Sequence, residues 1–138
     1  MNTNLADIFE AQNETERCDA LCRLYRGIFS KDIAIEEIFA RDYVQITDGK
    51  RSHFKAFCEH IERVLSQVQS LQIDVCDVCQ QGDLIADRHR VTVVYHDGRH
   101  AVIEVFAFMR CAEGRLCSLV ENTRVIQGDA ADQSLASC

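Results

Sequence analysis

The 138-residue sequence contains no proline, no long apolar run and no excess of basic residues. Proline lacks a backbone N–H donor, so its absence removes one obstacle to strand pairing. No segment approaches the roughly 18 consecutive apolar residues typical of a membrane-spanning helix. The formal net charge of −7, from 15 basic and 22 acidic residues, argues against nucleic acid, whose phosphates are bound by Lys and Arg. The same charge balance argues against a polybasic membrane anchor, so we expect no nucleic-acid and no membrane partner.

The composition is 47% hydrophobic and 27% charged, which is typical of a globular protein. The length predicts one domain over residues 1–138, and no internal repeat, linker or low-complexity tract divides it. The first ten residues have neither a basic start nor a long apolar core, and so do not form an export signal. We therefore expect a cytoplasmic protein.

Eight cysteines in a secreted protein of this size would predict a disulfide framework. Without an export signal, reduced thiols are the better interpretation, most of them buried as small apolar residues. The one Cys-x-x-Cys motif, Cys76 and Cys79, lies in a segment that alternates like a strand. Residues an odd number apart on a strand point to opposite faces, so these two sulfurs are expected to diverge.

Apolar residues at helical spacing predict a helix from about Glu14 to Ser30. Its stripe consists of Cys18, Leu21, Cys22, Tyr25, Ile28 and Phe29. A short leading helix is expected within residues 2–12 and another around residues 35–39. A further long helix is expected to begin near Ser52, a residue type that favours the N-cap, and to present Phe54 and Phe57 on its apolar stripe.

Strands dominate the rest of the chain. They are predicted at residues 43–47, 71–80, 84–95, 99–109 and 116–126, separated by Gly-containing turns such as Asp97-Gly98. Helices followed by an antiparallel meander indicate an α+β fold, with the helices grouped on one face of a curved sheet. The core is expected over residues 14–127, and the small, polar residues 128–138 are expected to fray.

Strand alternation places Glu104 on one face with Phe106 and Phe108. Both faces of each late strand are partly apolar, so periodicity does not decide which one meets the helices. A carboxyl group among apolar neighbours would have a raised pKa and could donate a proton near neutral pH. Alternatively, Glu104 forms a structural ion pair with an arginine of a neighbouring strand. Glu121 has the same two interpretations, and Arg88 and Arg90 are the candidate partners in either.

The histidines do not predict a metal site. His96 and His100 flank a turn without a third ligand, whereas catalytic zinc takes three protein ligands. His53 and His60 lie off the apolar stripe of their helix and are expected at the surface, and His89 is too isolated to assign as a base. We expect neither a metal nor an organic cofactor.

The order of elements resembles the nuclear-transport-factor-2-like superfamily, and within it the SnoaL-like and ketosteroid-isomerase-like branch. The resemblance covers roughly residues 14–127 and is carried by 24–32 (LYRGIFSKD), 38–43 (IFARDY), 102–108 (VIEVFAF), 113–116 (EGRL) and 120–122 (VEN). It implies a cone-shaped α+β fold, in which a curved antiparallel sheet wraps around helices, and a homodimer. The superfamily hosts isomerases, cyclases, dehydratases, hydrolases and non-catalytic binding modules.

In ketosteroid isomerases, a tyrosine of the first long helix and a protonated aspartate of a late strand form the oxyanion hole. Tyr25 resembles the tyrosine and Glu104 resembles the aspartate. The isomerase's catalytic base would fall near Thr47, with Asp48 as the nearest carboxylate. This departure argues against steroid isomerisation.

In limonene epoxide hydrolases, the acid of the last strand is similar to Glu121 and the mid-sheet arginine is similar to Arg88. Their aspartate position holds Arg90 here, so that triad is incomplete. Both comparisons imply that Arg88, Arg90, Glu104 and Glu121 share the cavity side of the sheet.

These features together predict a small pocket protein that binds a partly apolar molecule. Isomerase, cyclase, dehydratase or hydrolase chemistry would use Glu104 or Glu121 as acid or base, with Tyr25 donating to a developing oxyanion. The expected ligand-binding residues are Arg88, Arg90, Phe29, Phe54, Phe57, Phe106 and Phe108. The alternative is a non-catalytic ligand-binding or dimerisation module with a structural Arg/Glu network.

Overall fold

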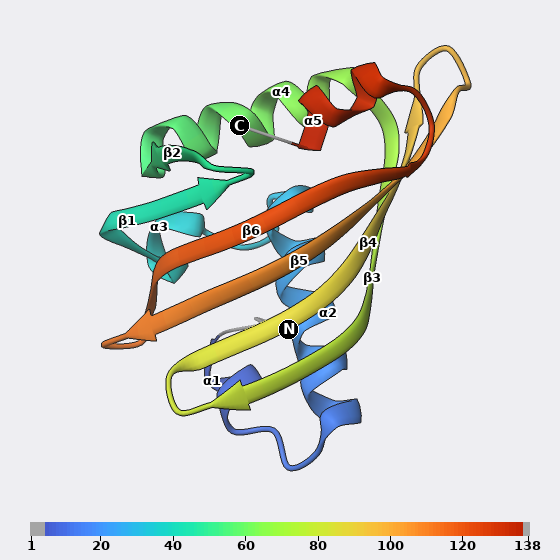
Figure 1. Ribbon diagram of the computed structural model, residues 1–138. Coiled ribbons are helices and arrows are strands. Elements are labelled where there is room, and N and C mark those ends of the chain that lie inside the picture. Colours follow the sequence, from blue (N-terminus) through green and yellow to red (C-terminus); the bar gives the residue numbers. More distant parts are fainter. Residues whose placement is uncertain (1–4, 137–138) are drawn as a thin grey trace.

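The computed structural model describes residues 5–136 (Figure 1). The helices are α1 (Leu5–Phe9), α2 (Glu14–Ser30), α3 (Ile35–Ile38), α4 (Phe54–Gln67), the 3₁₀ turn η1 (Ala130–Asp132) and α5 (Gln133–Ala136). The strands are β1 (Phe39–Thr47), β2 (Lys50–His53), β3 (Val68–Gln81), β4 (Leu84–Tyr95), β5 (His100–Ala112) and β6 (Arg115–Gln127).

The strands form one mixed sheet of order β2-β1-β6-β5-β4-β3. Strands β3 to β6 pair antiparallel in sequence order, and β1 joins the edge of this meander by pairing parallel with β6. The long strands bend strongly, and the sheet stays open (Figure 1). The predicted α+β cone is therefore confirmed, with β1 added through a parallel pairing.

Helix α2 has the bounds that its apolar stripe predicts. The Asn13 side chain caps it by accepting the Glu16 backbone N–H at 2.9 Å. Its buried face, formed by Leu21, Leu24 and Ile28, packs into the main hydrophobic core. This helix therefore covers the concave side of the sheet, and its buried face borders the space between the helix and the sheet.

Helix α4 begins at Phe54, with His53 at the N-cap, and Ser52 lies in β2. The predicted N-cap role of Ser52 is therefore wrong. Ser52 pairs across the sheet with Gln45 of β1, which holds its backbone in a strand. Its buried hydroxyl has no hydrogen-bond partner among the described residues. The helix ends at Gln67, because Val68 starts β3.

The C-terminal segment differs from the predicted frayed tail over the part that the structure describes. Residues Ala130–Ala136 form η1 and α5. Asp132 is buried and accepts a 2.6 Å hydrogen bond from the Tyr95 hydroxyl, while Leu135 is buried against β5 and β6. Specific polar contacts thus fix a segment whose composition alone predicts a loose end; residues 137–138 lie outside the described part.

The seven cysteines among the described residues are free thiols, and Cys138 lies outside them. None of the seven is fully buried, which corrects the expectation of mostly buried cysteines. Within residues 5–136, no helix has both the length and the apolar character needed to cross a membrane.

Candidate functional site

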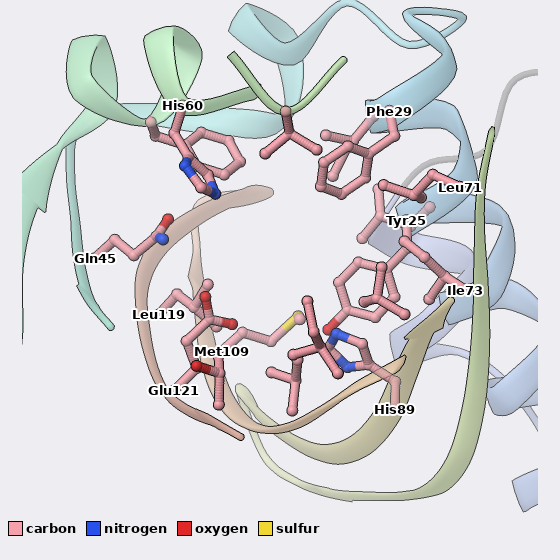
Figure 2. Close-up of a pocket in the computed structure, with 18 of the residues that line it drawn as sticks. Tyr25, Phe29, Gln45, His60, Leu71, Ile73, His89, Met109, Leu119 and Glu121 are labelled. Carbon is pink, nitrogen blue, oxygen red and sulfur yellow. The ribbon is translucent and has the colours of Figure 1, made fainter. Parts of the chain in front are cut away.

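The helices and the concave face of the sheet enclose a cavity of about 110 Å³ (Figure 2). Its walls are mainly aliphatic and aromatic side chains from α2, α4, β1 and β3 to β6. They include Leu24, Ile28, Phe29, Phe57, Leu71, Ile73, Val91, Val93, Ile103, Val105, Met109 and Leu119. Leu135 of α5 also reaches the wall, so the C-terminal turn helps to close the chamber. Such an apolar space with a few polar groups is typical of a small-molecule site.

The strand register decides which charged residues face this cavity. Residues directly opposite in an antiparallel pair lie on the same face. Glu121 pairs with Ala107, and this pair shares the concave face with Met109 and Val105. Glu104 pairs with Arg90 and Arg124 on the other face.

The expectation that four charged residues share the cavity side is therefore corrected. Glu121 lines the cavity, but Arg88, Arg90 and Glu104 belong to the convex face. Phe106 and Phe108 lie on that convex face too, at 47% and 51% exposure.

The other three predicted aromatic residues lie on the cavity side of the sheet, two of them in the cavity wall. Phe29 and Phe57 line the cavity as expected. Phe54 is half-buried and packs behind the wall, with its ring centre 5.8 Å from that of Phe39. The structure therefore brings together Tyr25, Phe29, Phe57 and Glu121 from the predicted set.

Glu104 forms an ion-pair network on the convex face. Its carboxylate accepts from Arg124 Nε at 2.7 Å and from Arg88 Nη1 at 3.3 Å, and Arg88 also bonds Asp77 at 2.7 Å. The hydrogen bond from Arg124, reinforced by Arg88, lowers the pKa of Glu104. This network matches the second interpretation of Glu104, a structural ion pair with arginines of the neighbouring strands. Glu104 does not line the cavity.

Tyr25, Asp87 and His89 form a hydrogen-bonded group at one side of the cavity. The Tyr25 hydroxyl donates to Asp87 Oδ2 at 2.6 Å, and His89 Nδ1 lies 2.6 Å from Asp87 Oδ1. The Asp87 side chain is completely buried. Asp87 and His89 are two residues apart on β4 and so point to the same face, where Tyr25 of α2 meets them.

This geometry fixes the proton arrangement of the group. A carboxylate beside Nδ1 favours the imidazole tautomer with its proton on Nδ1, which leaves the lone pair of the ring on Nε2. Burial, followed by the charge and hydrogen bond of Asp87, raises the pKa of Tyr25 well above its ordinary value. Because the single Tyr25 proton is donated to Asp87, the oxyanion contact expected from the resemblance is not the arrangement found.

Glu121 presents its carboxyl group to the same cavity from β6 (Figure 2). Its Oε1 accepts from the Thr47 hydroxyl at 3.1 Å, and Thr47 in turn accepts from Gln45 Nε2 at 2.9 Å. Burial raises the pKa of Glu121 to about 7, against weaker opposing effects of His89 and the Thr47 hydrogen bond. Glu121 is thus half protonated near neutral pH, the range in which a carboxyl group serves best as a general acid.

His60 of α4 also lines the cavity and is 8% exposed, although its position off the apolar stripe predicted a surface residue. Its Nδ1 lies 3.3 Å from Arg63 Nη2. Burial, followed by the charge of Arg63, lowers the pKa of His60 to about 4. The ring is therefore neutral at physiological pH.

Sequence reasoning missed Asp87, His89 and His60 as site residues. The signal for the first two was the carboxylate and imidazole at positions i and i+2 of one strand, which must share a face. Within residues 5–136, no three His, Cys, Asp or Glu side chains are grouped so as to hold a metal ion.

The chain belongs to the SnoaL-like domain family, whose profile matches residues 21–119, and it has the fold of nuclear-transport-factor-2-like proteins. An uncharacterized protein of Schizosaccharomyces pombe is 29% identical over 110 residues, covering 79% of this chain and 85% of that protein.

Two solved structures have the same fold. AclR of Streptomyces galilaeus, a candidate hydroxylase, matches with a TM-score of 0.68 and 17% identity over 89% of this chain and 97% of its own. IdmH of Streptomyces antibioticus, a candidate polyketide cyclase, matches with a TM-score of 0.64 and 19% identity over 78% of this chain and 90% of its own. At these identities, the likeness establishes the architecture and leaves the chemistry to the site.

Proposed function

We propose that this protein binds a small, largely apolar carbonyl compound in the concave cavity and moves protons on it. His89 is the base and Glu121 is the acid. The observation that carries the proposal is the convergence of these two groups on one apolar cavity, each held by its own buried hydrogen-bond partner.

The size of the cavity limits the ligand. About 110 Å³ is of the same order as the ~150 Å³ apolar cavity that accepts benzene, so a single small ring or a short branched chain suits the space. The apolar walls contribute burial of carbon surface, and the polar groups orient the ligand.

The acid–base step is a proton abstraction next to a carbonyl group. His89 Nε2 takes a proton from the α-carbon, the electrons of the C–H bond form the enol double bond, and the carbonyl oxygen takes the proton of Glu121. Asp87 stabilises the imidazolium that forms, and Tyr25 holds Asp87 in place, so both are positioning residues. An enol of this kind is the shared intermediate of isomerisation and of aldol-type cyclisation.

Cyclohexanone tests the proposal without knowledge of the natural ligand. In D₂O, the reverse of the proposed step returns deuterium to the α-carbon, and NMR measures its incorporation. The wild-type protein should accelerate exchange over buffer, and His89→Gln should lower the rate by about 10²-fold or more, the usual contribution of a positioned base. His96→Gln, an exposed residue of the β4–β5 turn, is the matched control. Equal rates for wild type and His89→Gln would refute the assignment of the base.

A second proposal concerns the oligomer that the family resemblance implied. Phe106, Phe108 and Val120 are exposed apolar residues of β5 and β6. Phe108 pairs with Val120, and Phe106 lies two residues before Phe108, so the three share the convex face of the sheet. Two copies of this exposed apolar surface can pair about a twofold axis, the commonest symmetry of soluble oligomers. We therefore expect a homodimer through this face. Phe108→Lys should convert it to a monomer in light scattering, and a wild-type monomer at high concentration would refute it.

The proposed dimer is also the basis of an alternative function. If the convex face and its Arg/Glu network serve assembly and the cavity only binds, the protein is a non-catalytic module. Saturable binding of cyclohexanone without accelerated exchange would favour that alternative. In either case, the cytoplasm is the location that we expect.

A further inference from the structure

His60 gives the cavity a second polar end. In Figure 2, His60 lies across the cavity from Tyr25 and His89, and the apolar side chains surround the space between them. It comes from α4, whereas the proposed base and acid come from β4 and β6 of the sheet. No step of the proposed proton transfer uses it.

The neighbour of His60 determines which of its nitrogens carries the proton. The Arg63 guanidinium lies 3.3 Å from Nδ1 and has only hydrogens to offer, so Nδ1 must accept. In the neutral ring, the proton is then on Nε2, the nitrogen left for the cavity. Among the described residues, the His60 side chain makes its hydrogen bond through Nδ1, and this Nε2–H has no partner. A donor that opens onto an apolar cavity is left to water or to an acceptor oxygen of the ligand, and a ligand that brings such an oxygen keeps this hydrogen bond when it displaces the water.

Resting on the proposed function, we infer that the ligand carries two oxygen functions at opposite ends of a small carbon frame. One is the carbonyl group that reacts beside His89 and Glu121. The other is an acceptor oxygen, a second carbonyl or a hydroxyl, which takes the hydrogen bond of His60 Nε2–H. His60 is therefore a specificity residue that selects dioxygenated compounds and fixes which α-carbon meets the base.

Two ring ketones of nearly the same size test this inference. Cyclohexanone has one oxygen, whereas cyclohexane-1,4-dione has a second oxygen directly across the ring. One added hydrogen bond is expected to tighten binding of the dione about fivefold, and its two equivalent carbonyl groups add a statistical factor of about two, so the affinity ratio of dione to monoketone should be about tenfold. Amide chemical-shift titration by NMR measures both dissociation constants on the intact protein.

Variants of His60 separate recognition from stability. His60→Leu keeps the bulk and removes the donor, so the affinity ratio of dione to monoketone should fall to about twofold. His60→Gln restores an N–H donor and should recover most of the tenfold ratio. His96→Leu, an exposed histidine away from the cavity, should leave the ratio unchanged.

The outcomes distinguish this inference from the function on which it rests. A wild-type ratio near two, or a tenfold ratio kept in His60→Leu, would overturn the role of His60 while leaving the proton transfer intact. If neither ketone gives saturable shifts, the proposed function itself is refuted, and this inference with it. A ratio that collapses in His60→Leu and recovers in His60→Gln supports it.

Discussion

The raised pKa of Glu121 should make the stability of the protein fall as the pH rises toward neutrality. Its carboxyl group ionises near pH 4.5 in the unfolded chain but near pH 7 in the fold. The stability that the protonated form gives is fully present below pH 4.5 and is lost as the pH rises through 7. This difference between the pKa values of the folded and unfolded states lowers the free energy of unfolding by about 3 kcal/mol once Glu121 is ionised in both states.

Glu121→Gln isolates this effect, because glutamine keeps an oxygen for the Thr47 hydroxyl and never ionises. We expect the free energy of unfolding of Glu121→Gln, relative to wild type, to rise by about 3 kcal/mol between pH 4.5 and about pH 8.5. Urea unfolding at several pH values measures this difference, and groups that titrate alike in both proteins cancel.

Glu104→Gln is the matched control of opposite sign. Arg124 and Arg88 lower the pKa of Glu104, so its contribution is present at pH values above its ordinary pKa and is lost as the pH falls through its lowered pKa. The stability difference between wild type and Glu104→Gln should therefore shrink in acid. A constant difference between wild type and Glu121→Gln across the neutral range would refute the raised pKa and remove the acid from the proposed mechanism.

Three further expectations concern the rest of the fold. Tyr25→Phe removes the hydrogen bond to the buried Asp87 carboxylate and should cost about 1–3 kcal/mol in urea unfolding; an unchanged midpoint would contradict that contact. Gly128 has a φ of 134°, and a Cβ there would clash with Asp132 Oδ2, so Gly128→Ala should destabilise the protein by about 1–3 kcal/mol and deprotect the α5 amides in hydrogen exchange. The described cysteines are free, so a reducing agent should leave the melting temperature unchanged, and a clear drop would reveal disulfides.

Local patterns in the sequence predicted α2, α4 and the strands β1 and β3 to β6, and the order of these elements indicated the fold class, whereas β2 and α5 were not predicted. The stripe on α2 predicts its bounds because burial of one helical face depends on residues close in sequence. The N-cap at Ser52 failed because a long-range pairing with Gln45 overrides a local capping preference. The C-terminal turn was missed for a similar reason, since the residues that hold Asp132 belong to a distant strand end.

The candidate site was harder to predict, because its faces depend on register. Both faces of the late strands carry apolar residues, and only the pairing of Ala107 with Glu121 shows that Glu121 faces inward while Glu104 faces outward. Tyr25 and Asp87 are 62 residues apart, so no local pattern could connect them. Family resemblance supplied Tyr25 and Glu121 correctly as cavity residues, but it also placed Arg88 and Glu104 on the wrong side.

The central claim is that Asp87 holds His89 with an unprotonated Nε2 facing the cavity. A long-range ¹H–¹⁵N NMR spectrum of the histidine rings tests it most directly, with His89→Gln identifying the signal. We predict that the neutral His89 ring carries its proton on Nδ1 and that Asp87→Asn shifts the ring toward the other tautomer. A neutral wild-type ring protonated on Nε2 would contradict the account, because no base would then face the ligand.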